Sequence, residues 1–272
     1  MDAKGIFLGV IVALAAAAGC RRPVERLEWP TMGTVAAVQT RGNAGLVAAA
    51  DLTRSVFASV EKTLNAHDPA SEIRQLAAED EATILARCSP DVRVCYRAAF
   101  ALSRETGGAF NPRWRGPETM DLGAIAKGFA VDRAAEDLRA QEGTGDVLVD
   151  LGGNLEAVRG EWRVGIAGSD RTVTLYPGDA CATSAEYYRG KHVKDGRTGG
   201  EVTNGVWSVT VIARASASTG DFAPGTLADG LSTALFVLGR EEGERLLRRF
   251  PGTEAIWIDG PGSGCDRIES DR

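Results

Sequence analysis

Two glycine-containing segments hold the residue types most able to do chemistry. The first, Asp121-Leu122-Gly123-Ala124-Ile125-Ala126-Lys127-Gly128, predicts a turn that leads into a helix, with Lys127 in the first helical turn. The exposed amides and the dipole of a helix start favour an anion, and Lys127 would add a positive charge. The spacing is not that of a P-loop. The segment therefore predicts an anion site of another kind, or a tight turn beside a solvated lysine.

The second segment is Ala228-Asp229-Gly230-Leu231-Ser232-Thr233-Ala234. In a helix, Asp229 and Thr233 stand at i and i+4 and share one face. A carboxylate and a hydroxyl there form half of a site for a hard cation such as Mg²⁺, which completes its shell with water and substrate phosphates. The alternative is that Asp229 caps the helix and Thr233 bonds its own helix backbone.

Three further polar turns carry chemistry-bearing residues. Asp150-Leu151-Gly152-Gly153-Asn154 follows a predicted strand, and its glycines permit either a simple turn or close approach to a ligand. His192 opens a polar turn that runs to Gly199 and is a candidate base or phosphate ligand, although a lone histidine also occurs as a plain surface residue. His67 lies in the third turn, next to Asp68-Pro69. His67 and His192 are the only histidines, which excludes a site built from several.

The composition is that of an ordinary globular protein. The chain has 272 residues, of which 44% are hydrophobic and 25% are charged, and this excludes global disorder and coiled coil. The formal net charge is −6. Nucleic-acid-binding proteins usually carry a basic surface, so this charge argues against that class of protein.

The elements that must position these residues alternate without a strict strand–helix rhythm, so the expected fold class is α+β. Apolar spacing and helix start and stop signals predict helices over 45–64, 89–107, 124–141, 227–238 and 241–250, the last two separated by Gly239-Arg240. A short helix begins at Ser71-Glu72. Strands are expected over 34–40, 146–151, 161–167, 209–213 and 255–258.

The N-terminus is typical of an exported lipoprotein. Lys4 precedes an apolar run that ends in Ala17-Ala18-Gly19-Cys20, which fits a signal peptide with a bacterial lipobox. The interpretation is a signal peptide over 1–19, lipidation of Cys20, a tether over 20–30 and a single domain over 31–272. An ordinary signal peptide with a chance cysteine is the alternative. The expected location is the bacterial cell envelope, lipid-anchored to the inner or outer membrane and facing the periplasm.

Four cysteines remain after Cys20, and an exported protein may form disulfides. Their pairing stays open, because four cysteines allow three full pairings. They are Cys88, Cys95, Cys181 and Cys265.

Taken in order, the motifs resemble those of the ApbE-type FAD:protein FMN transferases, many of which are bacterial lipoproteins. The resemblance covers nearly the whole mature chain, and 121–132 and 228–239 are its most specific parts. The motifs are MGT at 32–34, SEI at 71–73, TGGAF at 106–110, DLGAIAKG at 121–128 with Asp132, LGGN at 151–154, ATS at 182–184, HxxDxRTG at 192–199, SVTVIA at 208–213 and ADGLSTALFVLG at 228–239.

The resemblance implies a two-lobed α+β fold related to the T-fold, with FAD between the lobes. It also implies a Mg²⁺-dependent phosphotransferase that moves FMN from FAD to a Thr or Ser hydroxyl of a target protein and releases AMP. Targets in the family carry an Asp-x-x-Thr/Ser-Gly-Ala-Thr-like sequence, as in membrane redox subunits.

Site residues follow from the matching motifs. Mg²⁺ would be held by Asp229, Thr233 and the carbonyl of Ala124, with Ser232 nearby. Asp121 would hydrogen-bond FAD and Lys127 would lie near flavin or phosphate. His192 is the candidate for deprotonating the target hydroxyl. The cofactor pocket would be lined by Met32, His67, Ala109, Phe110 and Asn111.

The chain departs from the family pattern in several places. His67 stands where relatives often have a flavin-stacking Tyr, Asn111 replaces an Asp, and Gly196 replaces a Pro. The segment from Phe110 to Asp121 is also much shorter than in relatives. Two alternatives therefore stay open: a flavin-binding or flavin-storing lipoprotein without transfer activity, and a periplasmic FAD pyrophosphatase that uses water as acceptor.

Overall fold

Eight strands form one antiparallel sheet in the order β1-β2-β3-β4-β7-β8-β9-β10. The computed structural model describes residues 23–42, 45–141, 145–186, 193–217, 220 and 222–260, and the backbone of 265–269. The strands of the sheet are β1 (Val24–Thr31), β2 (Thr34–Arg41), β3 (Val147–Leu151), β4 (Asn154–Arg159), β7 (Ala180–Ala185), β8 (Ser208–Ala213), β9 (Thr253–Ile258) and β10 (Cys265–Glu269). A two-stranded ribbon, β5 (Trp162–Gly165) and β6 (Thr172–Leu175), leaves the sheet between β4 and β7.

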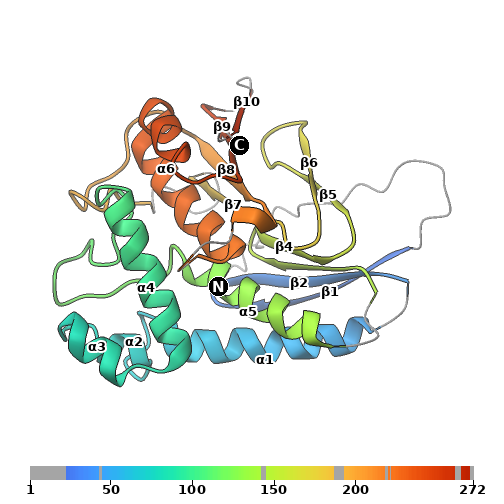
Figure 1. The fold of residues 1–272 in the computed structure, drawn as a ribbon, viewed down its shortest axis with the longest axis horizontal. Helices are drawn as coiled ribbons and strands as arrows, with labels where there is room; N and C mark the ends of the chain where they lie inside the picture. The colour runs from blue at the N-terminus through green and yellow to red at the C-terminus, as the bar shows by residue number, and fades with distance from the viewer. Residues whose placement is uncertain are drawn as a thin grey trace, which may run out of the picture.

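Helices enter this meander at two points. Five lie between β2 and β3, and the sixth lies between β8 and β9 (Figure 1). They are α1 (Leu46–Leu64), α2 (Glu72–Gln75), α3 (Glu81–Arg87), α4 (Pro90–Glu105), α5 (Ala126–Ala140) and α6 (Pro224–Leu247). Helix α5 packs against α1, α6 and β4, whereas α6 packs against α5, β7 and β8. The two segments most able to do chemistry therefore lie on neighbouring helices, one at the start of α5 and the other in the first half of α6.

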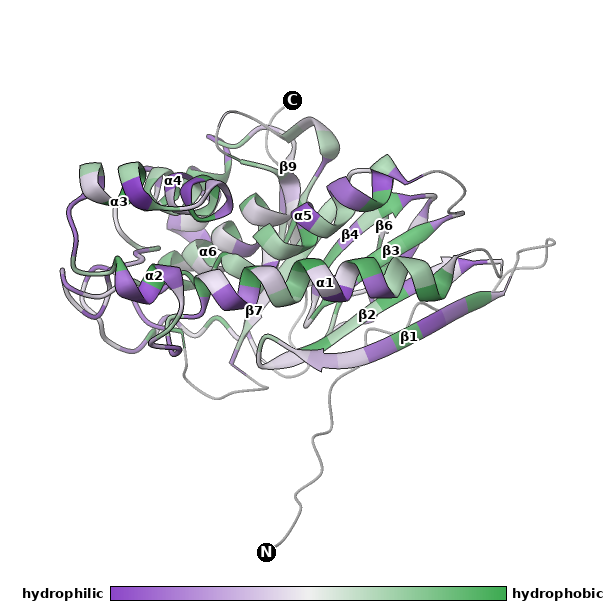
Figure 2. Cartoon of the chain, turned by 90° about the horizontal axis from the view of Figure 1, so that it is seen from below, coloured by the Kyte–Doolittle hydropathy of each residue, from purple (hydrophilic) through white to green (hydrophobic). Residues whose placement is uncertain are grey.

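The sheet is apolar on both faces because its strands alternate between two cores. Val209 and Val211 of β8 pack under the helices, whereas Ile212 faces the β5–β6 ribbon, whose Trp162 is fully buried. This two-residue period is the side-chain repeat of a strand. Figure 2 shows the apolar colouring of β2, β3 and β4 and the more hydrophilic outer strand β1.

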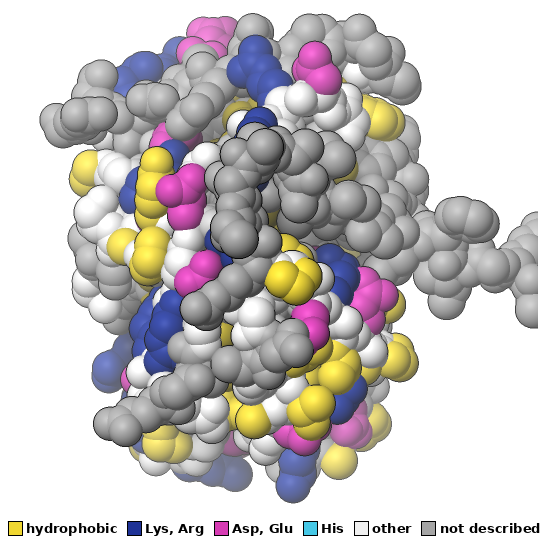
Figure 3. Space-filling view, turned by 90° about the vertical axis from the view of Figure 1, so that its right-hand side faces the viewer, with side chains coloured by type: hydrophobic (Ala, Val, Ile, Leu, Met, Phe, Trp, Pro, Cys, Tyr) yellow, Lys and Arg dark blue, Asp and Glu magenta, His cyan; other side chains and the backbone are white. Residues whose placement is uncertain are grey.

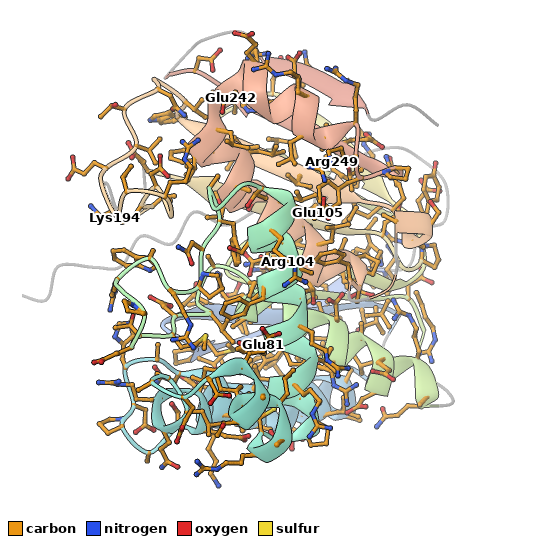
Figure 4. The ribbon with its side chains drawn as sticks, turned by 60° about the vertical axis from the view of Figure 1, so that its left-hand side comes forward. Glu81, Arg104, Glu105, Lys194, Glu242 and Arg249 are labelled. Carbon is orange, nitrogen blue, oxygen red and sulfur yellow. The ribbon has the colours of Figure 1, made fainter. Side chains whose placement is uncertain are left out.

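An ion pair ties α4 to the end of α6. Arg249, just beyond α6, pairs with the Glu105 carboxylate and also donates a 3.0 Å hydrogen bond to the Glu105 carbonyl. Figure 4 shows the two residues where the end of α4 meets the last turn of α6. On the face drawn in Figure 3, the described basic and acidic side chains are interspersed, as expected for a mildly acidic chain.

The prediction of a tether over residues 20–30 is wrong from Val24 onward, because Val24–Thr31 form the edge strand β1. Charged residues at Glu25, Arg26 and Glu28 hid the strand, and an edge strand tolerates them because one side faces solvent. The predicted helices starting near 45, 89 and 124 are confirmed as α1, α4 and α5. The two helices predicted around Gly239 run as one element, α6, interrupted at that residue, whose φ is 75°.

The signal peptide and Cys20 lie outside the described residues. Within the described part of the chain, no helix is long and apolar enough to cross a membrane. Cys88, Cys95 and Cys181 are buried free thiols. Burial raises the pKa of Cys181 to about 12 and that of Cys95 still further, so neither is a nucleophile at neutral pH.

Candidate functional site

The start of α5 and the first half of α6 meet at a chain of polar contacts. The Asp121 carboxylate accepts a 2.9 Å hydrogen bond from the Gly123 N–H. Lys127, the second residue of α5, reaches back to the Gly123 carbonyl at 3.2 Å. Its Nζ also lies 3.6 Å from Oδ1 of Asp229 on α6. The sequence prediction that a glycine-rich turn delivers a lysine to the start of a helix is therefore confirmed.

Asp229 lies inside α6 and does not cap it, since the helix begins at Pro224. Its side chain is 7% exposed, and Oδ2 accepts a 2.9 Å hydrogen bond from the Gly128 N–H at the start of α5. Amides at a helix start carry partial positive charge, so this position stabilises a carboxylate. The Asp229 carboxylate therefore lies between the α5 amide and the Lys127 ammonium.

Three hydroxyls lie together one turn further along α6. Ser184 Oγ on β7 lies 2.8 Å from Ser232 Oγ and 3.2 Å from Thr233 Oγ1. Ser232 Oγ also donates to the Asp229 carbonyl at 2.9 Å. Strand β7 therefore fixes the rotamers of both α6 hydroxyls and keeps Thr233 on the same face as Asp229.

Only glycine fits where α5 crosses α6. A Cβ on Gly128 would lie 2.1 Å from the Gly225 carbonyl oxygen, far inside van der Waals contact. A Cβ on Gly225 would lie 2.8 Å from the Gly128 carbonyl oxygen. The absence of side chains at these two positions allows the helix starts to approach closely enough for the Asp229–Gly128 hydrogen bond.

Met32 and His67 lie near the last turn of α1. Met32 occupies the two-residue turn between β1 and β2 with φ 48°, the left-handed region, and its N–H donates to Glu61 Oε2 at 3.2 Å. Such turns normally take Asn or Gly, and strain of this kind is concentrated at functional sites. His67 is exposed in the turn after α1, and its N–H donates to Asn65 Oδ1.

The Ala109–Asn111 stretch packs against the turn that follows His192. Asn111 Nδ2 donates to the Gly196 carbonyl at 2.8 Å, and Gly196 N–H donates to the Ala109 carbonyl at 3.1 Å. Ala109 and Phe110 are buried residues of this stretch. A Cβ at Gly196 would lie 2.4 Å from the Gly108 carbonyl oxygen, which explains glycine at that position.

Asp195 and Arg197 hold this turn together. The guanidinium hydrogen-bonds both carboxylate oxygens of Asp195 and lowers the pKa of that carboxyl. The turn also faces α6, because Arg197 lies 3.9 Å from Glu242. Figure 4 shows Glu242 and Lys194 in this part of the molecule. His192 itself lies outside the described residues.

The short segment from Asn111 to Asp121 is an organised turn. Arg113 donates to the carbonyls of Ala77 at 2.7 Å and Glu79 at 3.2 Å, and also to that of Pro117 within the segment. Arg115 lies 3.6 Å from the Asp121 carboxylate, at the entrance to the polar chain described above. The segment closes on itself and brings a second cation beside Asp121.

The Asp150–Asn154 turn is a hairpin turn between β3 and β4. A Cβ on Gly152 would lie 2.4 Å from Thr34 Oγ1, so its close neighbour is Thr34 and not an open space for a ligand. Asp150 Oδ1 accepts a 2.9 Å hydrogen bond from the Gly153 N–H. Burial raises the pKa of Asp150 to about 6, while that hydrogen bond and the charge of Arg26 act in the opposite direction.

We expect Asp150→Asn to change how stability depends on pH. The folded protein binds more protons than the unfolded chain between the ordinary pKa of 3.8 and about 6. The free energy of unfolding therefore falls as pH rises through that window. The full shift corresponds to about 3 kcal/mol, of which about 2 kcal/mol falls between pH 4 and pH 7. Over that range the asparagine variant should gain stability relative to wild type by about this amount. Urea unfolding at the two pH values measures this difference, with the exposed Asp137→Asn as control. Equal pH dependence in wild type and Asp150→Asn would contradict it.

The oxygen donors at the helix crossing suit a hard cation. No group of three or more His, Cys, Asp or Glu side chains that could hold a metal occurs in the described ranges. The expected ligands are instead the Asp229 carboxylate, the Thr233 hydroxyl and the Ala124 carbonyl, in the turn before α5. Mg²⁺ is commonly held by one or two carboxylates together with substrate phosphates. This donor set fits Mg²⁺ and gives no support for zinc, which takes Cys and His ligands.

The sequence patterns indicate no role for four residues that lie at this site. They are Gly128, Asp132, Ser184 and Gly225. Asp132 accepts hydrogen bonds from the Gly225 and Thr226 N–H groups at 2.7 and 2.6 Å, and Ser184 bonds both α6 hydroxyls. One signal was available: the spacing Gly-x-x-x-Asp occurs at 128–132 and again at 225–229.

Comparison with known proteins gives a consistent result. The chain matches the ApbE family over residues 32–119 and 114–257, two stretches that overlap within the short segment. It is 35% identical over 166 residues to the FAD:protein FMN transferase of Treponema pallidum (strain Nichols), covering 51% of this chain and 43% of that protein. It is also 35% identical over 153 residues to the FAD:protein FMN transferase of Klebsiella pneumoniae (strain 342), covering 51% and 45%. The match thus spans less than half the length of these curated relatives.

Solved structures show the same fold. The apo flavinyl transferase ApbE of Pseudomonas stutzeri superposes with a TM-score of 0.71 at 23% identity, covering 92% of this chain and 95% of that one. The ApbE protein of Thermotoga maritima gives a TM-score of 0.70 at 22% identity, covering 91% and 97%. The expected α+β, ApbE-like fold is confirmed. Because the family match extends over most of residues 32–257, the chain belongs to the ApbE family.

Proposed function

We propose that this protein is an FAD:protein FMN transferase that moves FMN from FAD to a Thr or Ser hydroxyl of a target protein and releases AMP. The relatives named as such enzymes support the proposal. The observation that carries it is the arrangement of Asp229, Thr233 and Lys127 at the start of α5. Phosphoryl transfer is catalysed mainly by positioning and charge neutralisation, and this arrangement supplies both.

The reaction balances as a substitution at phosphorus. The acceptor oxygen bonds to the FMN phosphorus, the bond from that phosphorus to the bridging oxygen breaks, AMP leaves with that oxygen, and the hydroxyl proton passes to a base. In this proposal His192 assists that deprotonation. Bound Mg²⁺ would neutralise phosphate charge.

The chain's own residues have distinct roles in the proposal. Asp229, Thr233 and the Ala124 carbonyl hold the cation, and Ser232 stands next to them. Lys127 leaves Asp229 for the substrate phosphate, a movement that its 25% exposed side chain permits. Asp121 hydrogen-bonds FAD, while Met32, His67 and the Ala109–Asn111 stretch line the flavin pocket.

We further propose that the mature protein is anchored by lipid on Cys20 and works on the periplasmic side of a bacterial membrane. The target would carry an Asp-x-x-Thr/Ser-Gly-Ala-Thr-like sequence, as in a membrane redox subunit.

A gel assay tests the function. The purified protein is mixed with FAD, Mg²⁺ and an acceptor bearing Asp-x-x-Thr-Gly-Ala-Thr, and a Thr-to-Val acceptor serves as the matched control. We expect flavin fluorescence on the denatured acceptor, together with AMP, and loss of both in EDTA. AMP and free FMN without labelled acceptor would identify a pyrophosphatase instead. Bound FAD that stays intact would identify a flavin-binding protein.

A further inference from the structure

Helices α5 and α6 cap each other through two copies of one motif. Gly128-x-x-x-Asp132 lies on α5 and Gly225-x-x-x-Asp229 lies on α6. The Gly128 N–H donates to Asp229 Oδ2 at 2.9 Å, and the Gly225 N–H donates to Asp132 Oδ1 at 2.7 Å. Each aspartate thus accepts a hydrogen bond from the glycine of the other helix, and the two glycine backbones touch at the crossing.

The two aspartates differ in how many donors they face. Asp132 accepts from the N–H groups of Gly225 and Thr226 and from the Thr226 hydroxyl, at 2.7, 2.6 and 2.5 Å. Among the described residues, Asp229 accepts one backbone hydrogen bond and faces the Lys127 ammonium. Asp132 is occupied in fixing the start of α6, whereas Asp229 keeps lone pairs for a ligand.

Side chains from other elements hydrogen-bond the first half of α6 at three points along its length. Asp132 binds its first turn and Ser184 binds Ser232 and Thr233. Asn204 Nδ2 donates to the carbonyls of Phe236 and Val237 at 2.8 and 3.1 Å, just before the interruption at Gly239. Asp229 and Thr233 lie between the first and last of these supports, and Asp132 supplies the first.

We propose that Asp132 is a positioning residue, which acts through the start of α6 to place Asp229 and Thr233 for a divalent cation. The proposal rests on the function proposed above. A side chain that orients metal ligands typically changes metal affinity by about 10- to 100-fold when it is mutated. Asp132→Asn keeps one acceptor oxygen but replaces the other with an amide donor that faces N–H groups, so the start of α6 must shift.

The first test is amide hydrogen exchange in the purified protein without metal or FAD. Asp132→Asn should speed exchange at Gly225 and Thr226, and also, by about tenfold or more, at Gly128, whose acceptor lies on the other helix. Asp137→Asn, which removes the same charge from the exposed face of α5, should leave all three amides unchanged. Faster exchange confined to Gly225 and Thr226 would make Asp132 a local cap and overturn the proposal.

The second test is Mn²⁺ binding followed by electron paramagnetic resonance, with Mn²⁺ alone as the probe. The dissociation constant should rise about tenfold or more in Asp132→Asn and stay unchanged in Asp137→Asn. Unchanged affinity in a folded Asp132→Asn protein would overturn the role of Asp132 alone. A wild-type protein that binds no Mn²⁺ would instead count against the proposed metal-dependent function.

If Asp132→Asn does not fold, a milder variant, Thr226→Val, still tests the proposal. Thr226→Val removes one of the three donors to Asp132 and keeps the side-chain shape. It should raise the Mn²⁺ dissociation constant in the same direction by a smaller factor, and wild-type affinity in this variant would likewise overturn the proposal.

Discussion

Asp229→Asn should fold normally and lose FMN transfer. The asparagine keeps an oxygen that can accept the hydrogen bond from the Gly128 N–H, so the helix crossing stays intact. It removes the charge that faces Lys127 at 3.6 Å and that would hold the cation. Losing an electrostatic group that acts on the transition state costs about 10²- to 10³-fold in rate, and loss of the metal adds to that. We expect kcat/KM for FAD to fall by at least about 10²-fold, measured by AMP release with a saturating acceptor.

The control for this variant is Glu241→Gln, an exposed carboxylate on the same helix whose partner is Arg245 at the surface. It should transfer FMN like wild type. Thermal unfolding should show that both variants are folded. Wild-type transfer by Asp229→Asn would refute the assignment of the site to the helix crossing.

Gly128→Ala should destabilise the protein severely. Alanine normally favours a helix over glycine by about 1 kcal/mol. Here its Cβ would lie 2.1 Å from the Gly225 carbonyl oxygen and 2.7 Å from Asp229 Cβ, so the backbones of α5 and α6 must separate. Separation breaks the Asp229–Gly128 and Asp132–Gly225 hydrogen bonds, both buried. Overpacking and unsatisfied buried groups each cost about 1–3 kcal/mol, so a net loss of about 4 kcal/mol is expected.

The matched comparison is Gly230→Ala, at a buried glycine that lies on α6. Its Cβ would meet the end of the Leu102 side chain, which can rotate away, and not a backbone atom. Urea unfolding should place Gly230→Ala well above Gly128→Ala in stability. Equal stabilities would show that the two helices can separate at the crossing without cost, contrary to the geometry described here.

The parts of the fold that the sequence predicted are those governed by local pattern. Helix α1 followed from the apolar spacing of Leu52, Val56, Val60 and Leu64, and the break in α6 followed from Gly239. Strand β1 was missed because its pairing with β2, and not its hydropathy, makes it a strand. Strand β7 was missed because its small side chains in Ala180–Ala185 lack the β-branched apolar run that indicates a strand.

In the candidate site, too, the sequence predicted the local features and missed the long-range contacts. The spacing of Asp229 and Thr233 put both on one helix face, and the Gly123–Lys127 turn placed a cation at a helix start. The hydrogen bond from Gly128 to Asp229 joins residues 101 apart, and the one from Gly225 to Asp132 joins residues 93 apart. No local pattern fixes such contacts, because they depend on how closely two helices approach. In the sequence, the close approach of the two helices is indicated only by Gly128 and Gly225, the glycines that permit it.

The most direct test of the account is the position of a cation in crystals grown with Mn²⁺ and FAD. Anomalous scattering from Mn²⁺ locates the ion without reference to any assumed site. The account predicts a peak at roughly 2.1 Å from a carboxylate oxygen of Asp229 and from Thr233 Oγ1, the distance expected for a hard octahedral cation. A fully occupied Mn²⁺ site away from these two residues, with FAD bound, would contradict it.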